Sequence, residues 1–294
     1  MTVWSKIADE IATATAKPFA LRVQRSIGGG CINSVAALEG NGQRYFAKLN
    51  DASKADMFEA EFAGLQEIAR VDAIRVPRPI CWGTAGTHAY LVLEWIDEGA
   101  SSAQSMARFG QDLAQLHRFT ADHYGWHRDN TIGSTPQVNT VSRDWIEFWR
   151  THRLGFQLEL AARKGYRGRL QRKGDALLNK VGVFFPGYTP QPSLLHGDLW
   201  AGNYTTDQDG RPVIFDPAVY YGDREADLAM TELFGGFTAG FYHAYRDAFP
   251  LDQGYGIRKT LYNLYHILNH LNLFGGGYGS QAERMIDTLL SEIR

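Results

Sequence analysis

Cysteine is nearly absent from this sequence. Only Cys31 and Cys81 occur among 294 residues, too few for a disulfide framework, and such scarcity is typical of a reducing compartment. The opening residues 1–7 lack the basic start and long apolar stretch of a signal peptide. No run of about 20 apolar residues is present to cross a membrane. We therefore expect a soluble cytoplasmic protein with no membrane partner.

An excess of charge of either sign is also missing. The chain has 30 Lys and Arg against 32 Asp and Glu, a formal net charge of −2. Without a basic surface, nucleic acid is not an expected partner. No pair of His, Cys or Glu has the spacing of a zinc site. We find no internal repeat and no low-complexity segment, so the length predicts one large domain or two lobes.

A polar loop within an apolar stretch is the most informative feature that is present. Residues 194–203 read Leu-Leu-His-Gly-Asp-Leu-Trp-Ala-Gly-Asn. Asp198 and Asn203 have the spacing of a kinase catalytic loop, where the aspartate meets a substrate hydroxyl and the asparagine holds magnesium. The alternative is that both residues only cap turns, the commonest role of Asp and Asn.

A predicted hairpin connects this loop to Asp216. A short strand from Tyr204, an Asp209-Gly210 turn and a second apolar strand ending at Phe215 form it. Phosphoryl transfer needs one group to orient the attacking hydroxyl and two groups to hold a hard cation against the phosphates. We interpret Asp198 as the catalytic group, Asn203 and Asp216 as Mg²⁺ ligands, and ATP as the phosphate donor.

The first part of the chain predicts a helix and three antiparallel strands. Apolar spacing is helical up to about residue 17, and residues 19–27, 35–38 and 44–49 read as strands. Glycine-rich connections allow backbone N–H groups to approach a triphosphate, although three glycines more often form a plain turn. Lys48 on the third strand favours the phosphate site, because kinases carry there the lysine that contacts the α and β phosphates. The predicted nucleotide-binding residues of this connection are Gly28, Gly29, Gly30, Cys31 and Asn33.

A helix is predicted over residues 53–70. A kinase lysine needs a helical glutamate to position it. We select Glu61, with Glu59 as the alternative, because the two point to different faces of the helix. A solvated surface charge is the competing interpretation for either one.

Two more strands, at residues 80–83 and 89–96, lead into an acidic linker. Glu94, Trp95 and Ile96 stand where the hinge of a two-lobed kinase bonds the adenine edge through its backbone. We therefore expect an α+β fold of two lobes. The predicted ranges are a nucleotide-binding lobe with a small antiparallel sheet at residues 1–98 and a mostly helical lobe at residues 99–294.

The rest of the chain is mostly helical in pattern. His117 and His152 lie among apolar residues at helical spacing, which favours packed or surface histidines over ligands. Residues 166–172 are interpreted as a solvated connection. The predicted helices cover residues 105–119, 144–163, 234–249, 258–274 and 280–294.

Several polar residues near the end of the chain have two open interpretations. In the segment 217–230 we favour a buried Asp227 that holds the catalytic loop, against a substrate-binding role. His266, Asn269 and His270 on one helix either border a substrate pocket or form an internal polar network. Trp200 is either a platform for the apolar face of a sugar or a core residue.

The chain resembles the fructosamine-3-kinase (ketosamine-3-kinase) family, in the aminoglycoside- and choline-kinase-like branch of the protein-kinase-like fold. The resemblance covers nearly the whole length. The Leu-Trp pair in the catalytic loop and the run Tyr-Tyr-Gly-Asp-Arg-Glu at residues 220–225 are specific to these kinases. The similar segments are Gly28–Asn33, Met57–Glu61, His196–Asn203, Phe215–Ala229 and Leu261–His270.

The resemblance implies ATP- and Mg²⁺-dependent phosphorylation of the 3-hydroxyl of a ketosamine carried by a free amine or a glycated protein. The substrate is a ribulosamine, an erythrulosamine or a fructosamine. The phosphoester then leaves readily, so that the amine is restored and the protein is deglycated. Trp200 and His270 are the expected substrate residues.

A redox role for Cys31 is a further expectation. Backbone N–H groups that suit phosphate also lower the pKa of a thiol, and members of the resembled family with this cysteine are thought to be redox-controlled. We expect a monomer that forms a Cys31-linked dimer on oxidation, with Cys81 as the alternative thiol.

Two rival functions remain at this point. One is a related small-molecule kinase that acts on an aminoglycoside, choline or homoserine. The other is a non-catalytic nucleotide-binding pseudokinase, which is disfavoured because Lys48, Asp198, Asn203 and Asp216 are all present.

Overall fold

The computed structural model describes residues 2–27 and 32–293, which pack into two compact units. The first unit comprises Met1–Ser105 and Tyr204–Pro217, and the second comprises Met106–Asn203 and Ala218–Arg294. The hairpin belongs to the first unit because Ile214 N donates to Arg75 O at 3.0 Å and Gly99 N donates to Thr206 O at 2.7 Å. The first unit therefore extends to Ser105 and includes the hairpin segment Tyr204–Pro217, whereas the predicted ranges were 1–98 and 99–294.

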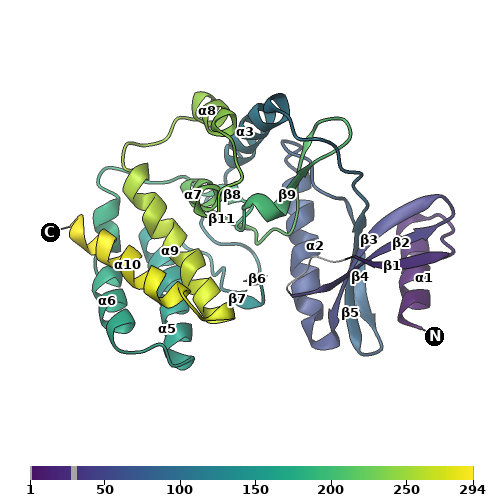
Figure 1. Ribbon diagram of the computed structural model, residues 1–294, viewed down its shortest axis with the longest axis horizontal. Helices are drawn as coiled ribbons and strands as arrows, with labels where there is room; N and C mark the ends of the chain where they lie inside the picture. The colour runs from purple at the N-terminus through teal and green to yellow at the C-terminus, as the bar shows by residue number, and fades with distance from the viewer. Residues whose placement is uncertain (1, 28–31, 294) are drawn as a thin grey trace. The chain divides into compact units, whose positions relative to one another are not determined.

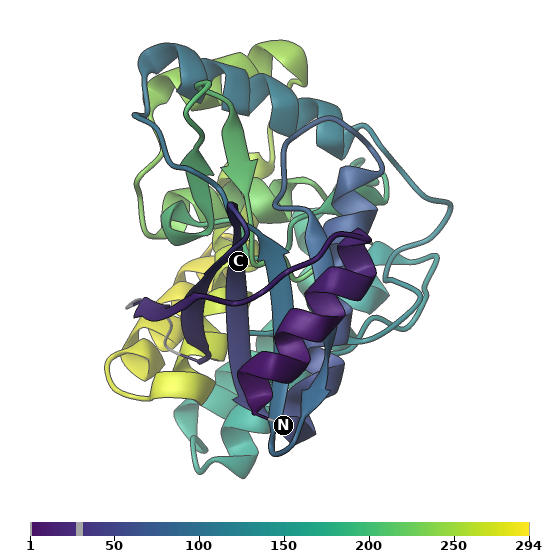
Figure 2. The same ribbon diagram turned by 90° about the vertical axis from the view of Figure 1, so that its right-hand side faces the viewer.

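A five-stranded antiparallel sheet forms the centre of the first unit (Figure 1). The strand order is β1-β2-β3-β5-β4, and α1 and α2 cover opposite faces of the sheet (Figure 2). The elements of this unit are α1 (Val3–Thr15), β1 (Val23–Ile27), β2 (Ser34–Gly40), β3 (Gln43–Asp51), η1 (Ala52–Lys54), α2 (Ala55–Ala69), β4 (Pro79–Ala85), β5 (His88–Glu94), β9 (Tyr204–Thr206) and β10 (Pro212–Ile214).

The alternation of side chains along β3 decides where Lys48 points. Tyr45, Ala47 and Leu49 belong to the core cluster that contains Ile7 of α1. Successive side chains of a strand point to opposite faces. Lys48 is therefore directed to the other face, which α2 covers.

The second unit is mostly helical, and α9 is buried along most of its length. Its buried residues are polar as well as apolar, and they include Arg258, Asn263 and Asn272. Helices α7 and α10 both pack against α9. The elements are α3 (Ala103–His117), β6 (Asn130–Ile132), β7 (Thr135–Gln137), α4 (Trp145–Phe148), the π-helix η2 (Trp149–Gly155), α5 (Phe156–Arg163), α6 (Arg169–Leu178), η3 (Val181–Phe184), β8 (Ser193–Leu195), η4 (Ala201–Asn203), β11 (Tyr220–Gly222), α7 (Glu225–Leu233), α8 (Ala239–Ala248), α9 (Tyr255–Phe274) and α10 (Tyr278–Ser291).

Some predicted elements differ from the observed ones. The solvated connection predicted at residues 166–172 is wrong from Arg169 onward, where α6 begins. Leu170 and Leu177 of α6 are buried, and Lys173 forms an ion pair with Asp287 of α10, so this helix depends on a distant partner. The helix predicted from residue 234 begins only at Ala239, because Gly235 and Gly236 have φ angles of +74° and +94°.

Other boundaries also moved. The predicted strand 19–27 begins only at Val23, and the predicted helix 144–163 contains the π-helical segment Trp149–Gly155. Such segments interrupt an α-helix without ending it. Within the described part of the chain, every helix is too short or too polar to be a membrane-spanning candidate.

Candidate active site

The predicted catalytic loop follows the buried strand β8 in the second unit. Ala218 N donates to His196 O at 2.8 Å, which ties the loop to the segment before β11. Gly197 has a φ of +82°, and an added Cβ would lie 2.1 Å from Ala218 O. Only glycine allows this close passage of two backbones.

Asp227 of α7 fixes the backbone of the loop. Its carboxylate accepts hydrogen bonds from His196 N at 2.7 Å and Gly197 N at 2.8 Å, and the side chain is buried. Burial disfavours the charged form, but hydrogen bonds from His117 and the loop hold the pKa of Asp227 below its ordinary value. The preferred interpretation of Asp227 as the residue that holds the catalytic loop is confirmed.

His117 is a packed residue, as predicted. Its Nε2 lies 3.2 Å from Asp227 Oδ2 and its Nδ1 lies 2.8 Å from the Tyr245 hydroxyl. Burial lowers the pKa of His117, so the neutral ring donates to Asp227 and accepts from Tyr245. His152 is also packed, with its ring 5.4 Å from that of Phe148.

We expect Asp227→Asn to lower both the melting temperature and kcat. Bonds to a charged group are each worth about 1.5–3 kcal/mol, and the amide keeps the volume but loses the charge. Because the folded pKa of Asp227 is depressed, its contribution to stability is present at neutral pH and is lost as the pH falls through that pKa. The difference between variant and wild type should therefore shrink on acidification. Thermal unfolding at several pH values measures it.

The control is Asp247→Asn, which changes an exposed carboxylate paired with His243 on α8. This variant should unfold and turn over like the wild type. Equal unfolding of Asp227→Asn and wild type at neutral pH would contradict the role of Asp227.

Asn203 is held directly against Asp198. Its Nδ2 donates to Asp198 O at 2.9 Å and to Asp198 Oδ2 at 3.2 Å, and Asn203 N donates to Trp200 O at 2.9 Å. The amide nitrogen of Asn203 is thus engaged by Asp198, and the role of its carbonyl oxygen as a Mg²⁺ ligand stays a prediction.

In the first unit, the predicted site residues Glu61 and Asp216 both contact Lys48. Its Nζ lies 2.6 Å from Glu61 Oε1 and forms a second, very short ion pair with Asp216. Glu61 is therefore the helical glutamate that contacts Lys48. The lysine side chain is 4 % exposed and that of Asp216 is 44 % exposed.

Charge sets the pKa values of this cluster. Burial opposes the charge on Lys48, but the carboxylates of Asp216 and Glu61 outweigh burial and raise the pKa of Lys48 above its ordinary value. Burial raises the pKa of Glu61 to about 7, assisted by the charge of Asp216 and opposed by Lys48. Two carboxylates thus share one ammonium.

Asp216 adopts a backbone conformation that few residues accept. Its φ is +57°, in the left-handed region that Asp and Asn tolerate better than other non-glycine residues. Its carboxylate offers oxygen donors, which is the ligand chemistry that Mg²⁺ prefers, and its role as a ligand stays a prediction. Within residues 2–27 and 32–293, no cluster of three or more His, Cys, Asp or Glu suggests another metal site.

The predicted adenine segment is partly engaged within its own unit. Glu94 N donates to Arg78 O at 2.8 Å, and the Glu94 carboxylate lies 2.9 Å from Arg75. The Trp95 ring lies 4.3 Å from the Arg44 guanidinium. The N–H and the side chain of Glu94 are thus engaged, and an adenine contact through the backbone of Glu94, Trp95 and Ile96 stays a prediction.

The glycine-rich connection is described only at its end. Gly28, Gly29, Gly30 and Cys31 lie outside the described residues. Asn50 Nδ2 donates to Asn33 Oδ1 at 2.8 Å, which ties the end of this connection to β3. Cys81 is buried, and burial raises its thiol pKa to about 12, so its reactive thiolate is disfavoured at neutral pH.

The two predicted substrate residues are linked through a residue that the sequence did not reveal. The Trp200 ring is 6.2 Å from that of Phe234, and the Phe234 ring is 5.2 Å from that of His270. Asn269 accepts from Gln157 Nε2 at 3.3 Å, so it belongs to an internal polar network. The apolar periodicity of the sequence could not reveal this role of Phe234, because the residue lies outside a helix, between the end of α7 and Gly235.

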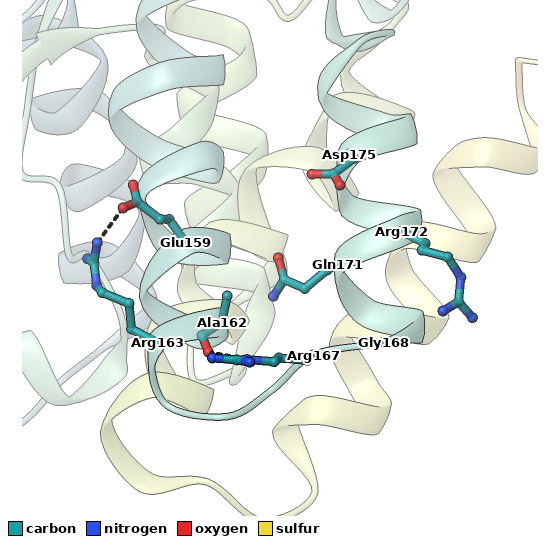
Figure 3. Close-up of a pocket in the computed structure, with 8 residues that line it drawn as sticks. All are labelled: Glu159, Ala162, Arg163, Arg167, Gly168, Gln171, Arg172 and Asp175. Atoms are coloured by element: carbon teal, nitrogen blue, oxygen red, sulfur yellow. Dashed lines mark hydrogen bonds and ion pairs between the residues drawn. The ribbon is translucent and has the colours of Figure 1, made fainter.

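A separate surface pocket of about 490 Å³ lies between α5 and α6 (Figure 3). Arg163 is paired there with Glu159 at a short distance, and Arg167 Nε contacts Ala162 O at 3.4 Å. Figure 3 shows Arg172 directed away from the other labelled side chains. The predicted catalytic, nucleotide and substrate residues do not line this pocket.

Comparison with known proteins decides the family. A model of the family described as fructosamine kinase matches residues 3–292. The chain belongs to this fructosamine kinase family. The chain is 49 % identical to a probable ketoamine kinase of Synechocystis, over 98 % of this chain and 97 % of the relative. It is 43 % identical to a chloroplastic protein-ribulosamine 3-kinase of Oryza sativa, over 92 % of this chain and 79 % of the relative.

Solved structures agree with this membership. The fold matches the crystal structure of a candidate fructosamine-3-kinase from Haemophilus somnus with a TM-score of 0.90 and 30 % identity, covering 98 % of this chain and 97 % of the other. Choline kinase from Streptococcus pneumoniae shares the fold alone, with a TM-score of 0.63 and 13 % identity, covering 99 % and 100 % of the two chains. The predicted family, the two-lobed kinase-like α+β fold and the kinase class are confirmed.

Proposed function

We propose that this member of the fructosamine kinase family transfers the γ-phosphoryl group of ATP to the 3-hydroxyl of a ketosamine on a free amine or a protein. The Lys48–Glu61–Asp216 cluster carries the phosphate side of the proposal, because it presents an ammonium on a rigid strand with a cation-binding carboxylate beside it. The relative named protein-ribulosamine 3-kinase, which is 43 % identical, supports the acceptor class.

In this proposal each of the predicted site residues has one role. Asp198 accepts the proton of the sugar hydroxyl, and its loop is held in place by Asp227. Lys48 binds the α and β phosphates, with Glu61 as its positioning partner. Asn203 and Asp216 hold Mg²⁺, which when bound neutralises charge on the phosphates.

The remaining predicted residues surround the substrates. The backbone of Glu94, Trp95 and Ile96 contacts adenine, Asn33 and the glycine-rich connection cover the phosphates, and Trp200 and His270 contact the ketosamine. Positioning and charge neutralisation account for most of the rate, because phosphoryl transfer requires little covalent work from the protein. The scarcity of cysteine supports a cytoplasmic location.

The product then decomposes without further help from these residues. Loss of a C1 proton gives a 1,2-enaminol, and the C3–O bond breaks as phosphate leaves. Water hydrolyses the resulting imine, which releases the original amine and a 3-deoxy-2-ketoaldehyde. This sequence is the chemical basis of deglycation.

Incubation of the protein with Mg²⁺, ATP and ribulosyl-lysine or fructosyl-lysine should yield a 3-phosphate that ³¹P NMR detects. The relative rates for the two sugars establish which ketosamine is preferred. Phosphorylation of an aminoglycoside, choline or homoserine alone, or of no compound in the panel, would refute the proposal.

A further inference from the structure

A row of aromatic side chains begins beside the catalytic residue of the second unit. Trp200 follows Asp198 by two positions, and its ring is 6.2 Å from that of Phe234 at the end of α7. The ring of His270 on α9 then lies 5.2 Å from Phe234 and 5.6 Å from Phe274. The row ends at Tyr278 of α10, whose ring is 5.1 Å from His270. We call these five residues the aromatic row.

The row is open to solvent, unlike the aromatic core of the same unit. Trp200 is 39 % exposed, Phe234 is 43 % exposed and Phe274 is 54 % exposed. Single exposed apolar residues need no explanation, but contiguous ones mark binding sites. These three are the exposed large aromatic side chains among residues 2–27 and 32–293 other than Trp82.

Glycines at defined positions assemble the start of the row. A Cβ added at Gly202 would lie 2.3 Å from the Trp200 ring, so glycine lets the indole fold over its own loop. A Cβ at Gly236 would lie 2.4 Å from Ala201 Cβ. Glycine at this second position lets the segment after α7 rest on the catalytic loop, which brings Phe234 to Trp200.

A glycine turn assembles the far end. Gly275 and Gly276 have φ angles of +69° and +63°, a conformation that favours glycine. Gly275 N donates to Leu271 O at 2.9 Å and ends α9. The chain then reverses into α10, which packs against α9 (Figure 1) and places Tyr278 against His270.

The chemistry of the row suits a cation on an apolar arm. Burial lowers the pKa of His270, so at neutral pH its ring contributes an uncharged aromatic face. Aromatic faces attract ammonium groups and pack against methylene chains. A ketosamine carries both features, since its sugar is joined to a protonated secondary amine at the end of a lysine side chain.

We propose that the aromatic row binds the amine side of the ketosamine, meaning the secondary ammonium, the lysine methylenes and the adjoining peptide. This inference rests on the proposed function, and it names the protein-bound substrate that the site selects. Continuity with the catalytic loop supports it, because the row begins at Trp200, two residues after Asp198, and continues ring by ring to α10. The two ring-to-ring steps from Phe234 through His270 to Phe274, of 5.2 Å and 5.6 Å, correspond to at most about three residues of extended peptide.

The experiment compares two substrates in the intact protein. The small one is ribulosyl-glycine, and the large one is a peptide whose ribulosyl-lysine has phenylalanine on both sides. Phe274→Ala should raise KM for the peptide by about 3- to 10-fold, the equivalent of one aromatic contact. The KM for ribulosyl-glycine and both kcat values should stay unchanged, because ribulosyl-glycine has no lysine side chain or flanking peptide to reach Phe274, which is separated from Trp200 by Phe234 and His270.

Two further variants make the test specific. Phe274→Leu keeps apolar area but loses the aromatic face, so an intermediate KM for the peptide is expected. Val183→Ala removes an exposed apolar side chain, 55 % exposed, that is outside the row, and should behave as wild type with both substrates.

The outcomes separate the two proposals. If wild type phosphorylates neither substrate, the proposed function fails and this inference fails with it. If both substrates are phosphorylated but Phe274→Ala shifts neither KM, or shifts both equally, the aromatic row is refuted while the proposed function stands.

Discussion

Replacing Asp198 with asparagine should lower kcat by about 10²- to 10⁴-fold, the usual contribution of a general base. The amide has nearly the same volume, and the backbone bond from Asn203 Nδ2 to Asp198 O at 2.9 Å does not involve the carboxylate. The loop should therefore keep its shape while it loses the group that accepts the hydroxyl proton. Affinity for Mg-ATP should change little, because Lys48, Glu61 and Asp216 are untouched.

The measurement is kcat with ribulosyl-lysine together with calorimetric titration of Mg-ATP. Asp209→Asn is the matched control, since Asp209 is a turn aspartate whose side chain is 73 % exposed and paired with Arg211. It should retain wild-type turnover. If Asp198→Asn kept more than about a tenth of wild-type kcat, well short of the range for a general base, the assignment would be wrong.

Replacing Asp216 with asparagine should remove the magnesium dependence of ATP binding. Loss of a partner that only orients a metal ligand costs about 10- to 100-fold in affinity or activity, so loss of a ligand should cost at least as much. Asparagine is the suitable replacement because it tolerates the φ of +57° at this position. An alanine variant would add backbone strain to the loss of the carboxylate.

Calorimetric titrations with ATP in excess Mg²⁺ and in a chelator measure the effect. Wild type should bind more tightly with the metal, and Asp216→Asn should bind equally in both. Glu61→Gln is the informative comparison, because Glu61 also contacts Lys48 but is not a proposed ligand. That variant should lose ATP affinity and keep its magnesium dependence. An unchanged magnesium dependence in Asp216→Asn would exclude it as a ligand.

The buried charges around the loop explain why both variants should remain folded. Asp227 holds the backbone of His196 and Gly197, whereas Asp198 and Asp216 are partly exposed. Stability and chemistry thus depend on different carboxylates. We therefore expect Asp198→Asn to lose activity and to keep the melting temperature of the wild type.

Local spacing was sufficient to predict the polar residues of the site. Asp198 and Asn203 lie in one loop, and a short hairpin leads to Asp216, so their roles depend on neighbours in sequence. Lys48 was likewise predicted from its place on the third strand, and in the structure the alternation along β3 directs it to the face opposite Tyr45 and Leu49. Such patterns are properties of the chain itself, and they indicated the fold class and the kinase chemistry.

Contacts between distant segments decided the rest. The choice between Glu61 and Glu59 required knowing which face of α2 meets β3. Helix α6 depends on partners such as Asp287 of α10, and the aromatic row joins rings from the catalytic loop, α7, α9 and α10. The free energy of such contacts belongs to pairs of segments far apart in the chain. The sequence therefore determined the loop and the hairpin that carry the predicted catalytic and cation-binding residues, and only tertiary packing decided which side chains surround them.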